Sequence, residues 1–240
     1  MKLALVGALA VLTLGARPFH PSAGSGYRQA SRARSAEAFT LQTGGITRTP
    51  VVDNATVEVS RFHVPPGTSE LIQTETVPCL VIQVTPGDVE HTLGADQTNG
   101  PRPAGSVTFV PGGVFHKATN IGKAPFDLVA IRIKPTRPPA PAAPATAAPA
   151  GITRTTLIDN ADVRVVRVKF APSGREPLHT HPNDLLTVQI SAGKIEILNG
   201  SDSTTGDRAP GFVQFLPRDV AHAYSSADRR TFELLSISLK

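Results

Sequence analysis

The 240-residue sequence contains no tryptophan, two tyrosines and a single cysteine, Cys79. One cysteine excludes an intramolecular disulfide, and the apolar run of residues 77–82 around it indicates a buried small side chain rather than a nucleophile. A core without tryptophan has to be built from Val, Ile, Leu and Phe. Apolar residues with the 3.6-residue period of an amphipathic helix are also missing. These absences predict small β-rich cores that no disulfide holds together.

Residues 45–134 and 151–240 carry almost no excess positive charge. The chain carries a net charge of +5, but residues 1–44 alone contain five basic residues and one acidic residue. Residues 45–134 have a net charge of −1, and residues 151–240 have a net charge of +1. Nucleic-acid binding requires a basic face on a folded unit or an aromatic platform, and neither is visible. We therefore expect no nucleic-acid partner.

The sequence repeats itself with an offset of 106 residues. The segment Gly-Ile-Thr-Arg-Thr at 45–49 returns at 151–155, and Asp-Asn-Ala at 53–55 returns at 159–161. Without any insertion, 33 of the 90 aligned positions of 45–134 and 151–240 are identical. A repeat of this length indicates a duplicated domain rather than a solenoid unit.

The segments outside the two copies have a different composition. Residues 1–16 combine Lys2, an uncharged apolar stretch and small residues before Arg17, which is typical of a signal peptide. The stretch is too short to span a bilayer, so we expect secretion or a periplasmic location without a stable membrane anchor. Residues 17–44 are expected to form a flexible arm, and the Pro/Ala-rich residues 135–150 an extended linker.

Within each copy, apolar and polar residues alternate. Val57 and Val59 are spaced by two, and so are Val163 and Val165. Further short apolar runs are separated by turn pairs such as Asn-Gly at 99–100 and at 199–200. Many short strands with frequent turns predict an antiparallel sandwich or barrel in each copy.

Three histidines of the second copy have a spacing suited to metal binding. His179 and His181 would share one face of a strand, and His222 follows about 40 residues later, where a barrel returns to the same interior. Three imidazoles with open coordination positions suit a divalent transition metal ion such as Fe, Ni, Cu, Mn or Zn. The alternative is a set of neutral histidines in a barrel that binds an organic ligand or nothing.

The sequence resembles the cupin superfamily in both copies. The second cupin motif has Gly, Pro, Gly, His and Asn at fixed spacing, and the first copy matches it with Gly105, Pro111, Gly113, His116 and Asn120. The second copy matches it at Gly211, Pro217 and His222, with Asp219 and Ser226 in the other two positions. The first motif, His-x-His followed by Glu and Gly, is matched by His179, His181 and Gly193, with Leu186 at the Glu position.

The resemblance implies an all-β bicupin, with two tandem jelly-roll (cupin-type) β-barrels joined by the Pro/Ala-rich linker. Residues 45–134 would form the first barrel and residues 151–240 the second. In the second barrel His179, His181 and His222 would hold the metal ion. Asp184 is a candidate fourth ligand or a partner for a histidine N–H, or else a turn residue.

The first copy retains little of the metal-ligand set. The residues aligned with the paired histidines are Gln73 and Glu75, so only His116 and Glu75 remain as a vestigial site. We expect this barrel to be free of metal and to have a structural role.

Several other residues have less specific interpretations. Tyr224 would share the face of His222 and contact a ligand or pack in the core. Arg61 and Arg167 occupy matched positions and are expected to pair with Asp53 and Asp159 or neighbouring carboxylates of their own copies. Strand-edge or surface positions are expected for the remaining charged residues and histidines, namely Glu70, Glu176, His63 and His91.

Three functional classes are compatible with this pattern. The first is a metal-dependent oxidoreductase of the dioxygenase type, in which the ion orients a chelating substrate and O₂. The second is a non-catalytic module that binds a small molecule or a structural metal ion. The third, an isomerase or a sugar-modifying enzyme, requires a general acid or base that the sequence does not identify. A small-molecule ligand fits all three, and a homo-oligomer is compatible with them.

Overall fold

The computed structural model describes residues 39–40, 45–135, 149–172 and 174–240. Within these residues the regular structure consists of eighteen strands and no helix, so the all-β prediction is confirmed. The expected signal peptide at 1–16 lies outside the described residues, as do the arm at 17–44 except for Phe39–Thr40 and the linker at 135–150 except for its ends. No helix of the described part is long and apolar enough to cross a bilayer.

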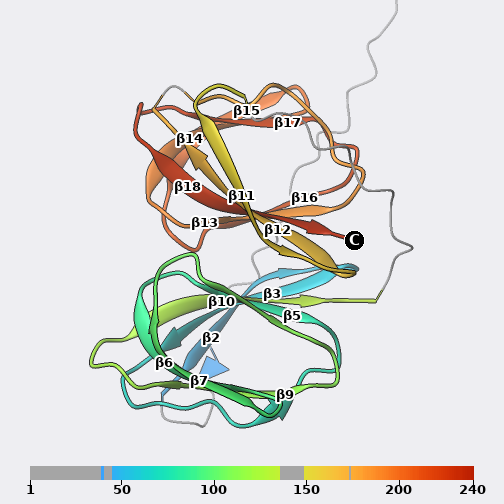
Figure 1. Ribbon diagram of the computed structural model, residues 1–240. Helices are drawn as coiled ribbons and strands as arrows, with labels where there is room; N and C mark the ends of the chain where they lie inside the picture. Colours follow the sequence, from blue (N-terminus) through green and yellow to red (C-terminus); the bar gives the residue numbers. More distant parts are fainter. Residues whose placement is uncertain (1–38, 41–44, 136–148, 173) are drawn as a thin grey trace, which may run out of the picture. The chain divides into compact units, whose positions relative to one another are not determined.

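The N-terminal barrel consists of two antiparallel sheets (Figure 1). One has the order β1-β2-β3-β10-β5-β8, and the other has the order β4-β9-β6-β7. The strands are β1 (Phe39–Thr40), β2 (Thr47–Asp53), β3 (Val57–Val64), β4 (Gln73–Thr74), β5 (Cys79–Gln83), β6 (Gly87–Leu93), β7 (Asp96–Arg102), β8 (Val107–Val110), β9 (Phe115–Asn120) and β10 (Phe126–Ile133).

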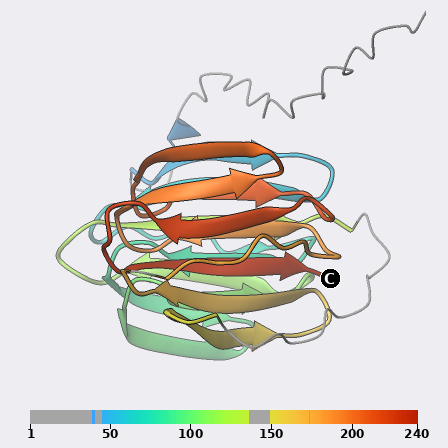
Figure 2. The same ribbon diagram turned by 90° about the horizontal axis from the view of Figure 1, so that it is seen from above.

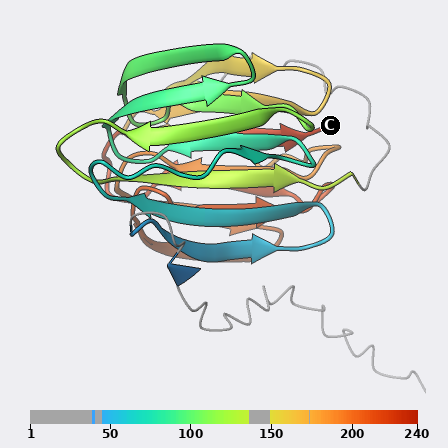
Figure 3. The same ribbon diagram turned by 90° about the horizontal axis from the view of Figure 1, so that it is seen from below.

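The C-terminal barrel repeats this arrangement with two sheets of its own. Their orders are β11-β12-β18-β13-β16 and β15-β14-β17. Figure 2 looks onto this barrel and Figure 3 onto the other, and the strands of each run side by side in both views. The strands are β11 (Ile152–Asp159), β12 (Val163–Phe170), β13 (Leu185–Gln189), β14 (Gly193–Asn199), β15 (Asp202–Arg208), β16 (Val213–Leu216), β17 (His222–Ser226) and β18 (Phe232–Leu239).

The repeated Asp-Asn-Ala segments form the same turn in both barrels. Asn54 Oδ1 accepts hydrogen bonds from the backbone of Thr56 and Val57, each at 2.9 Å, and Asn160 Oδ1 binds the matching backbone two and three residues on. Such Asx turns fix the chain reversal between two strands. The pairing of these strands also shifts register at matched places, between Pro50 and Val52 and one copy later. The sequence repeat thus encodes local geometry.

The largest hydrophobic core lies between the two barrels. It joins buried residues of β3, β5 and β10 with buried residues of β12, β13 and β18, among them Val59, Leu80, Ile131, Val165, Leu186 and Ile237. These sheets are therefore covered on both faces, which explains strands without an exposed face such as β13, where all five residues are buried.

Two arginines cross this interface reciprocally. Arg167 donates a hydrogen bond to Gly105 O at 2.9 Å, and Arg61 donates one to Pro210 O, next to Gly211, at 3.4 Å. A Cβ at Gly105 would lie 2.6 Å from the Arg167 guanidinium, and one at Gly211 would lie 3.0 Å from that of Arg61. The first glycine of the second cupin motif therefore makes room for the arginine of the other barrel.

This arrangement corrects the expectation that Arg61 and Arg167 pair with Asp53 and Asp159. Asp53 instead contacts Lys134 Nζ at 2.6 Å, and Asp159 contacts Lys240. Sequence patterns within one copy do not reveal a contact between copies, so the two arginines were assigned to the wrong partners.

Candidate metal centre

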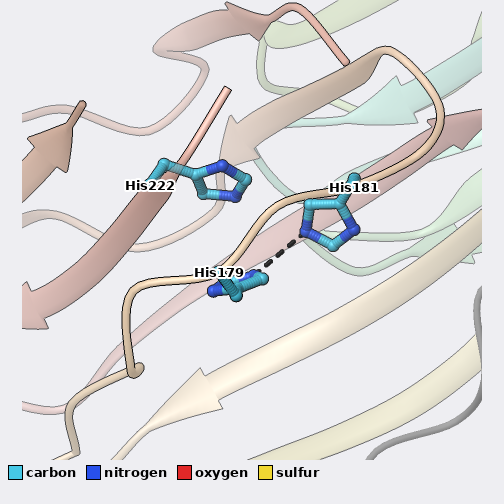
Figure 4. Close-up of side chains that lie close together, drawn as sticks. All are labelled: His179, His181 and His222. Carbon is cyan, nitrogen blue, oxygen red and sulfur yellow. Dashed lines mark hydrogen bonds between the residues drawn. The ribbon is translucent and has the colours of Figure 1, made fainter. Parts of the chain in front are cut away.

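Three histidines gather in the C-terminal barrel. One ring nitrogen each of His179, His181 and His222 lies within 4.8 Å of the other two. Figure 4 shows the three rings pointing toward one another, two from the segment before β13 and one from β17. His222 is buried and the other two are half-buried. The sequence prediction that these three side chains meet is confirmed.

Backbone pairing holds the segment of His179 against β17. The amide of His179 donates to His222 O at 3.0 Å, and the amide of His222 donates to His179 O at 2.8 Å. The amide of Asp219 donates to His181 O at 2.8 Å. These bonds fix all three histidines to neighbouring backbone before any ion binds, which lowers the ordering cost of ligation.

Side-chain hydrogen bonds select the tautomer of two histidines. Nδ1 of His179 lies 2.8 Å from Pro177 O, and Nδ1 of His222 lies 3.1 Å from Val220 O. Because a carbonyl only accepts, each Nδ1 carries the proton and each Nε2 presents its lone pair. His181 Nε2 lies 3.0 Å from His179 Nε2 and donates to it. This donor set fits a divalent transition metal ion, which would replace the shared proton.

The environment keeps His181 and His222 neutral. Burial, together with the neighbouring His222 and His179, lowers the pKa of His181 to about 4. Burial lowers the pKa of His222 to about 4 as well, although its bond to Val220 O opposes the shift. Neutral imidazole is the form that ligates metal ions, so these histidines are ready for ligation at neutral pH.

The histidines line a cavity of about 470 Å³ inside the barrel. Tyr224 also lines it, as the sequence predicted, and its ring centroid lies 6.0 Å from that of His222. Its hydroxyl donates to Gln214 Oε1 and lies next to Thr187 Oγ1, both at 3.2 Å. Burial raises the pKa of Tyr224. Tyr224 is therefore a neutral wall residue whose proton is already used within the protein.

Asp184 does not join the histidines. Within the described part of the chain, the group of possible metal ligands contains the three imidazoles alone, and Asp184 is absent from the cavity wall. Its Oδ1 accepts the amide of Arg218 at 2.9 Å and so holds the loop before β17. The interpretation of Asp184 as a turn residue describes the structure better than that of a fourth ligand.

Leu186 also faces away from the cavity. It is fully buried in the core between the barrels, whereas Leu185 and Thr187 line the cavity. Side chains alternate along a strand, so a position of the cavity wall lies one residue to either side of Leu186. The resemblance placed the glutamate of the first cupin motif at Leu186, and no carboxylate takes its place at these neighbouring positions.

The N-terminal barrel has an ion-pair network where the other barrel has three histidines. His116 Nδ1 lies 3.2 Å from Glu70, and its Nε2 lies 3.5 Å from Glu75. Burial alone would lower the pKa of His116, but the two carboxylates outweigh it and raise the pKa to about 9. The same contact lowers the pKa of Glu75 against its burial, and Arg132 adds to this effect. Among the described residues, no group of possible metal ligands includes His116 or Glu75.

Three residues that were expected at strand edges or on the surface line the cavities instead. Glu70 lines the N-terminal cavity and Glu176 the C-terminal one, where it pairs with Arg154 Nη2 at 2.8 Å. His91 also lines the N-terminal cavity, and burial, followed by the nearby His116, lowers its pKa. The identity of Glu70 and Glu176 in both copies was a usable signal, whereas His91 left none. His63 is half exposed beside Asp127, as a surface position should be.

The two copies have a similar backbone conformation at a position of the second cupin motif where their residues differ. Gly113 has φ of 82°, and Asp219 at the matched position has φ of 60°. Asn120 binds Val64 O and Ala124 O, each at 3.0 Å, whereas Ser226 binds Asp228 and Arg230. Aspartate tolerates this left-handed conformation better than most residues, which explains its presence there.

Comparison with known proteins gives matches in structure alone. No family model and no curated protein matches the sequence. A cupin 2 conserved barrel domain protein from Leptotrichia buccalis is similar with a TM-score of 0.58 and 13% identity, over 84% of this chain and 92% of that chain. An oxalate decarboxylase from Lactobacillus farciminis is similar with a TM-score of 0.66 and 11% identity, over 84% of this chain and 83% of that chain. A salicylate 1,2-dioxygenase from Pseudaminobacter salicylatoxidans is similar with a TM-score of 0.63 and 11% identity, over 80% of this chain and 76% of that chain. The two barrels of this chain thus have the cupin jelly-roll fold.

Proposed function

We propose that this chain is an exported bicupin whose C-terminal barrel binds one divalent transition metal ion through His179, His181 and His222. The protein would act as an oxidoreductase of the dioxygenase type on a small molecule that enters the C-terminal cavity. The observation that carries the proposal is the convergence of three imidazoles, with one ring nitrogen each within 4.8 Å of the others, on the wall of a cavity of about 470 Å³.

The donor set limits the ions that fit. Imidazole nitrogens suit Fe, Ni, Cu, Mn and Zn, whereas Mg and Ca prefer oxygen ligands. When bound, such an ion supplies Lewis acidity and, for Fe, Cu and Mn, one-electron redox chemistry. Three neutral ligands leave its charge uncompensated, which favours an anionic or chelating small molecule. The names of two structural neighbours, a salicylate dioxygenase and an oxalate decarboxylase, are compatible with an anionic or chelating small molecule.

The chain's own residues define where a small molecule would lie. Arg154, held by Glu176, and the wall residues Thr187 and Tyr224 border the same cavity as the histidines. The cavity also has an apolar part that includes Phe170 and Leu234. A ring with a polar chelating edge matches this combination, because the edge faces the imidazoles while the ring contacts the apolar wall.

A non-catalytic binding module is the second candidate, and the pairing of the acidic side chains favours it. Among the described residues, the acidic groups on the cavity wall are Glu176 and Asp159, and both are in ion pairs, with Arg154 and with Lys240. A general acid or base needs a group that can exchange a proton with the substrate. If neither ion pair opens, the barrel would bind a small molecule without turnover.

Metal analysis of the purified chain tests the site. We expect about one transition metal ion per chain after reconstitution, and none in a His179→Ala/His181→Ala variant. The matched control, His63→Ala/His91→Ala, removes two histidines of the other barrel and should keep the ion. Equal metal content in all three proteins, or none in any of them, would contradict the proposal.

O₂ uptake separates the two candidate functions. The metal-loaded chain is assayed with phenolic and diketone substrates, beside the His179→Ala/His181→Ala variant. Consumption of O₂ that the variant lacks would support the oxidoreductase. Metal-dependent binding of the same compounds without consumption would support the binding module.

Export is tested separately from the metal site. The full chain and a chain that begins at residue 17 are expressed in a bacterium with two membranes, and the periplasm is separated from the cytoplasm. We expect only the full chain in the periplasm, with its N-terminus shortened near residue 16. A full chain retained in the cytoplasm at full length would rule out the signal peptide.

A further inference from the structure

The N-terminal barrel contains a cavity of about 300 Å³ that is separate from the histidine cluster. Its polar wall is formed by side chains that alternate in charge along a continuous chain of contacts. Arg48 contacts Glu58, Arg132 contacts Glu58 at 3.4 Å and Glu75 at 3.0 Å, and His116 lies between Glu75 and Glu70. Six charged groups thus neutralise one another along one side of the cavity.

Two hydrogen-bond donors among these six charged groups are left without a hydrogen bond. His116 Nε2 and Arg132 Nε are both buried and have no hydrogen-bond partner among the described residues, although each lies within 3.5 Å of a Glu75 oxygen. These contacts are ion pairs whose alignment is too poor for hydrogen bonding. His116 is only 4% exposed and borders the cavity. A buried donor without a partner costs free energy, so a ligand that satisfies it would bind favourably.

The remaining wall combines apolar side chains with His91, Arg102 and a few uncharged polar residues. Phe62, Val64, Val89, Phe126 and Leu128 line it, and Leu71 lies beside them with 70% of its surface exposed. Aromatic and aliphatic walls suit a flat ring, whose burial contributes most of the binding free energy of a small ligand.

We propose that the N-terminal barrel binds a neutral ring compound with a hydroxyl group, such as a phenol, without a metal ion. A hydroxyl both donates and accepts, so it accepts from His116 Nε2 or Arg132 Nε and donates to a Glu75 or Glu70 oxygen. The ring packs against Phe62 and Phe126. The occupant differs from that of the other barrel because it needs no ion.

The alternation of charge is the reason for a neutral ligand. A carboxylate would approach Glu70 and Glu75 as closely as it approaches His116, and an ammonium group would meet His116 and Arg132. Beside these six groups, either charged ligand would have to break an existing ion pair and would lose solvation as well. A hydroxyl satisfies the free donors without disturbing the ion pairs.

Comparison of the two copies supports a separate specialisation. At the positions of Glu58, Glu75 and Arg132 the C-terminal barrel has Arg164, His181 and Ser238. The row of alternating ion pairs is therefore specific to the N-terminal barrel, just as the group of three histidines is specific to the C-terminal one. Two cavities with different chemistry in one duplicated fold indicate two different occupants.

Calorimetric titration of phenol into the full chain tests this inference. The titrations use the His179→Ala/His181→Ala background, so that no metal ion contributes to binding. We expect one phenol per chain, and about tenfold weaker binding of benzene and of benzoate, which lack the hydroxyl or add a charge. Phenol that binds no better than benzene and benzoate, or does not bind at millimolar concentration, would overturn the proposal.

A matched pair of variants locates the site. Ala130 on β10 and Ser236 on β18 occupy equivalent positions, and each lines the cavity of its own barrel. Ala130→Leu should weaken phenol binding at least about tenfold, whereas Ser236→Leu should leave it unchanged. The opposite result would place the phenol in the C-terminal barrel. If Ala130→Leu does not fold, Ala118→Leu blocks the same cavity at the position where the other barrel carries Tyr224.

Discussion

At the scale of single residues, His116 and His222 show how environment decides the charge of the same side chain. They occupy matched positions in the two copies, yet the pKa of His116 is raised to about 9 and that of His222 is lowered to about 4. The difference comes from the neighbours, since two carboxylates face His116 and two imidazoles face His222.

These shifts predict opposite pH dependences of stability. Below the ordinary pKa of 6.5 His116 contributes its full stabilisation, and this is lost as the pH rises toward about 9. His116→Gln should therefore lower the free energy of unfolding more below pH 6.5 than above pH 9. Urea denaturation across this range measures the difference, and a cost that does not change with pH would contradict it.

His222 provides the control with the reverse sign. Its neutral form stabilises the fold above pH 6.5, and this contribution is lost as the pH falls toward about 4. In metal-free protein, His222→Gln should therefore gain stability relative to the unmodified chain as the pH falls through that interval. The same slope for both substitutions would show that the two histidines have similar environments after all.

Asp219 adopts a backbone conformation that most residues avoid. Its φ of 60° lies in the left-handed region. Glycine has no penalty there, and alanine lacks the local hydrogen bonds that help aspartate. We expect Asp219→Gly and Asp219→Ala to differ in free energy of unfolding by about 1 kcal/mol, with the glycine variant more stable. Equal stabilities in urea denaturation would contradict this account.

At the scale of elements, the two faces of β13 belong to different environments. Leu185 and Thr187 border the cavity, and Leu186 packs in the core between the barrels. A carboxylate at residue 187 would therefore meet the histidines' cavity, whereas one at residue 186 would be buried without a partner.

This alternation predicts opposite outcomes for two glutamate substitutions. Leu186→Glu should destabilise the chain by several kcal/mol, roughly 4 or more, because it buries an unpaired charge. Thr187→Glu should leave the chain folded and tighten the binding of a transition metal ion, since it adds an anionic group to the cavity wall. Thermal unfolding and metal titration measure both effects. Tighter metal binding by Leu186→Glu would show that residue 186 faces the cavity.

Strand-level features followed from the sequence to the extent that they are local. The alternation of apolar residues predicted β-structure, and the fixed spacing of His179, His181 and His222 predicted their convergence. Leu186 and Asp184 were misplaced because the short segment between His181 and β13 does not continue the alternation of a strand. The contacts of Glu70 with His116 and of Arg167 with Gly105 span long sequence distances, which no local pattern encodes.

At the scale of the whole molecule, the two barrels share their largest core, so they should unfold together. Two positions test the contact between them. Gly105 and Gly113 have similar φ values of 79° and 82°, but only at Gly105 would an added Cβ meet Arg167. Gly105→Ala should therefore cost about 1 kcal/mol more than Gly113→Ala, because it also displaces a hydrogen bond across the interface.

A double-variant cycle isolates this interface term. In an Arg167→Ala background the difference between Gly105→Ala and Gly113→Ala should disappear, as measured by urea denaturation. A difference that persists would assign the extra cost to the loop itself. Calorimetry of the unmodified chain should show a single cooperative transition for both barrels.

The reciprocal contacts of Arg167 on Gly105 and of Arg61 beside Gly211 follow the rule of a symmetric homodimer, in which each surface meets its own copy. The chain thus has the interface of a dimer whose subunits are encoded in one gene. In such a fused dimer, one half can lack metal ligands as long as it still covers its neighbour. Expressed alone, the C-terminal half would expose Val165, Leu186 and Ile237 to water and would be expected to aggregate or pair with itself.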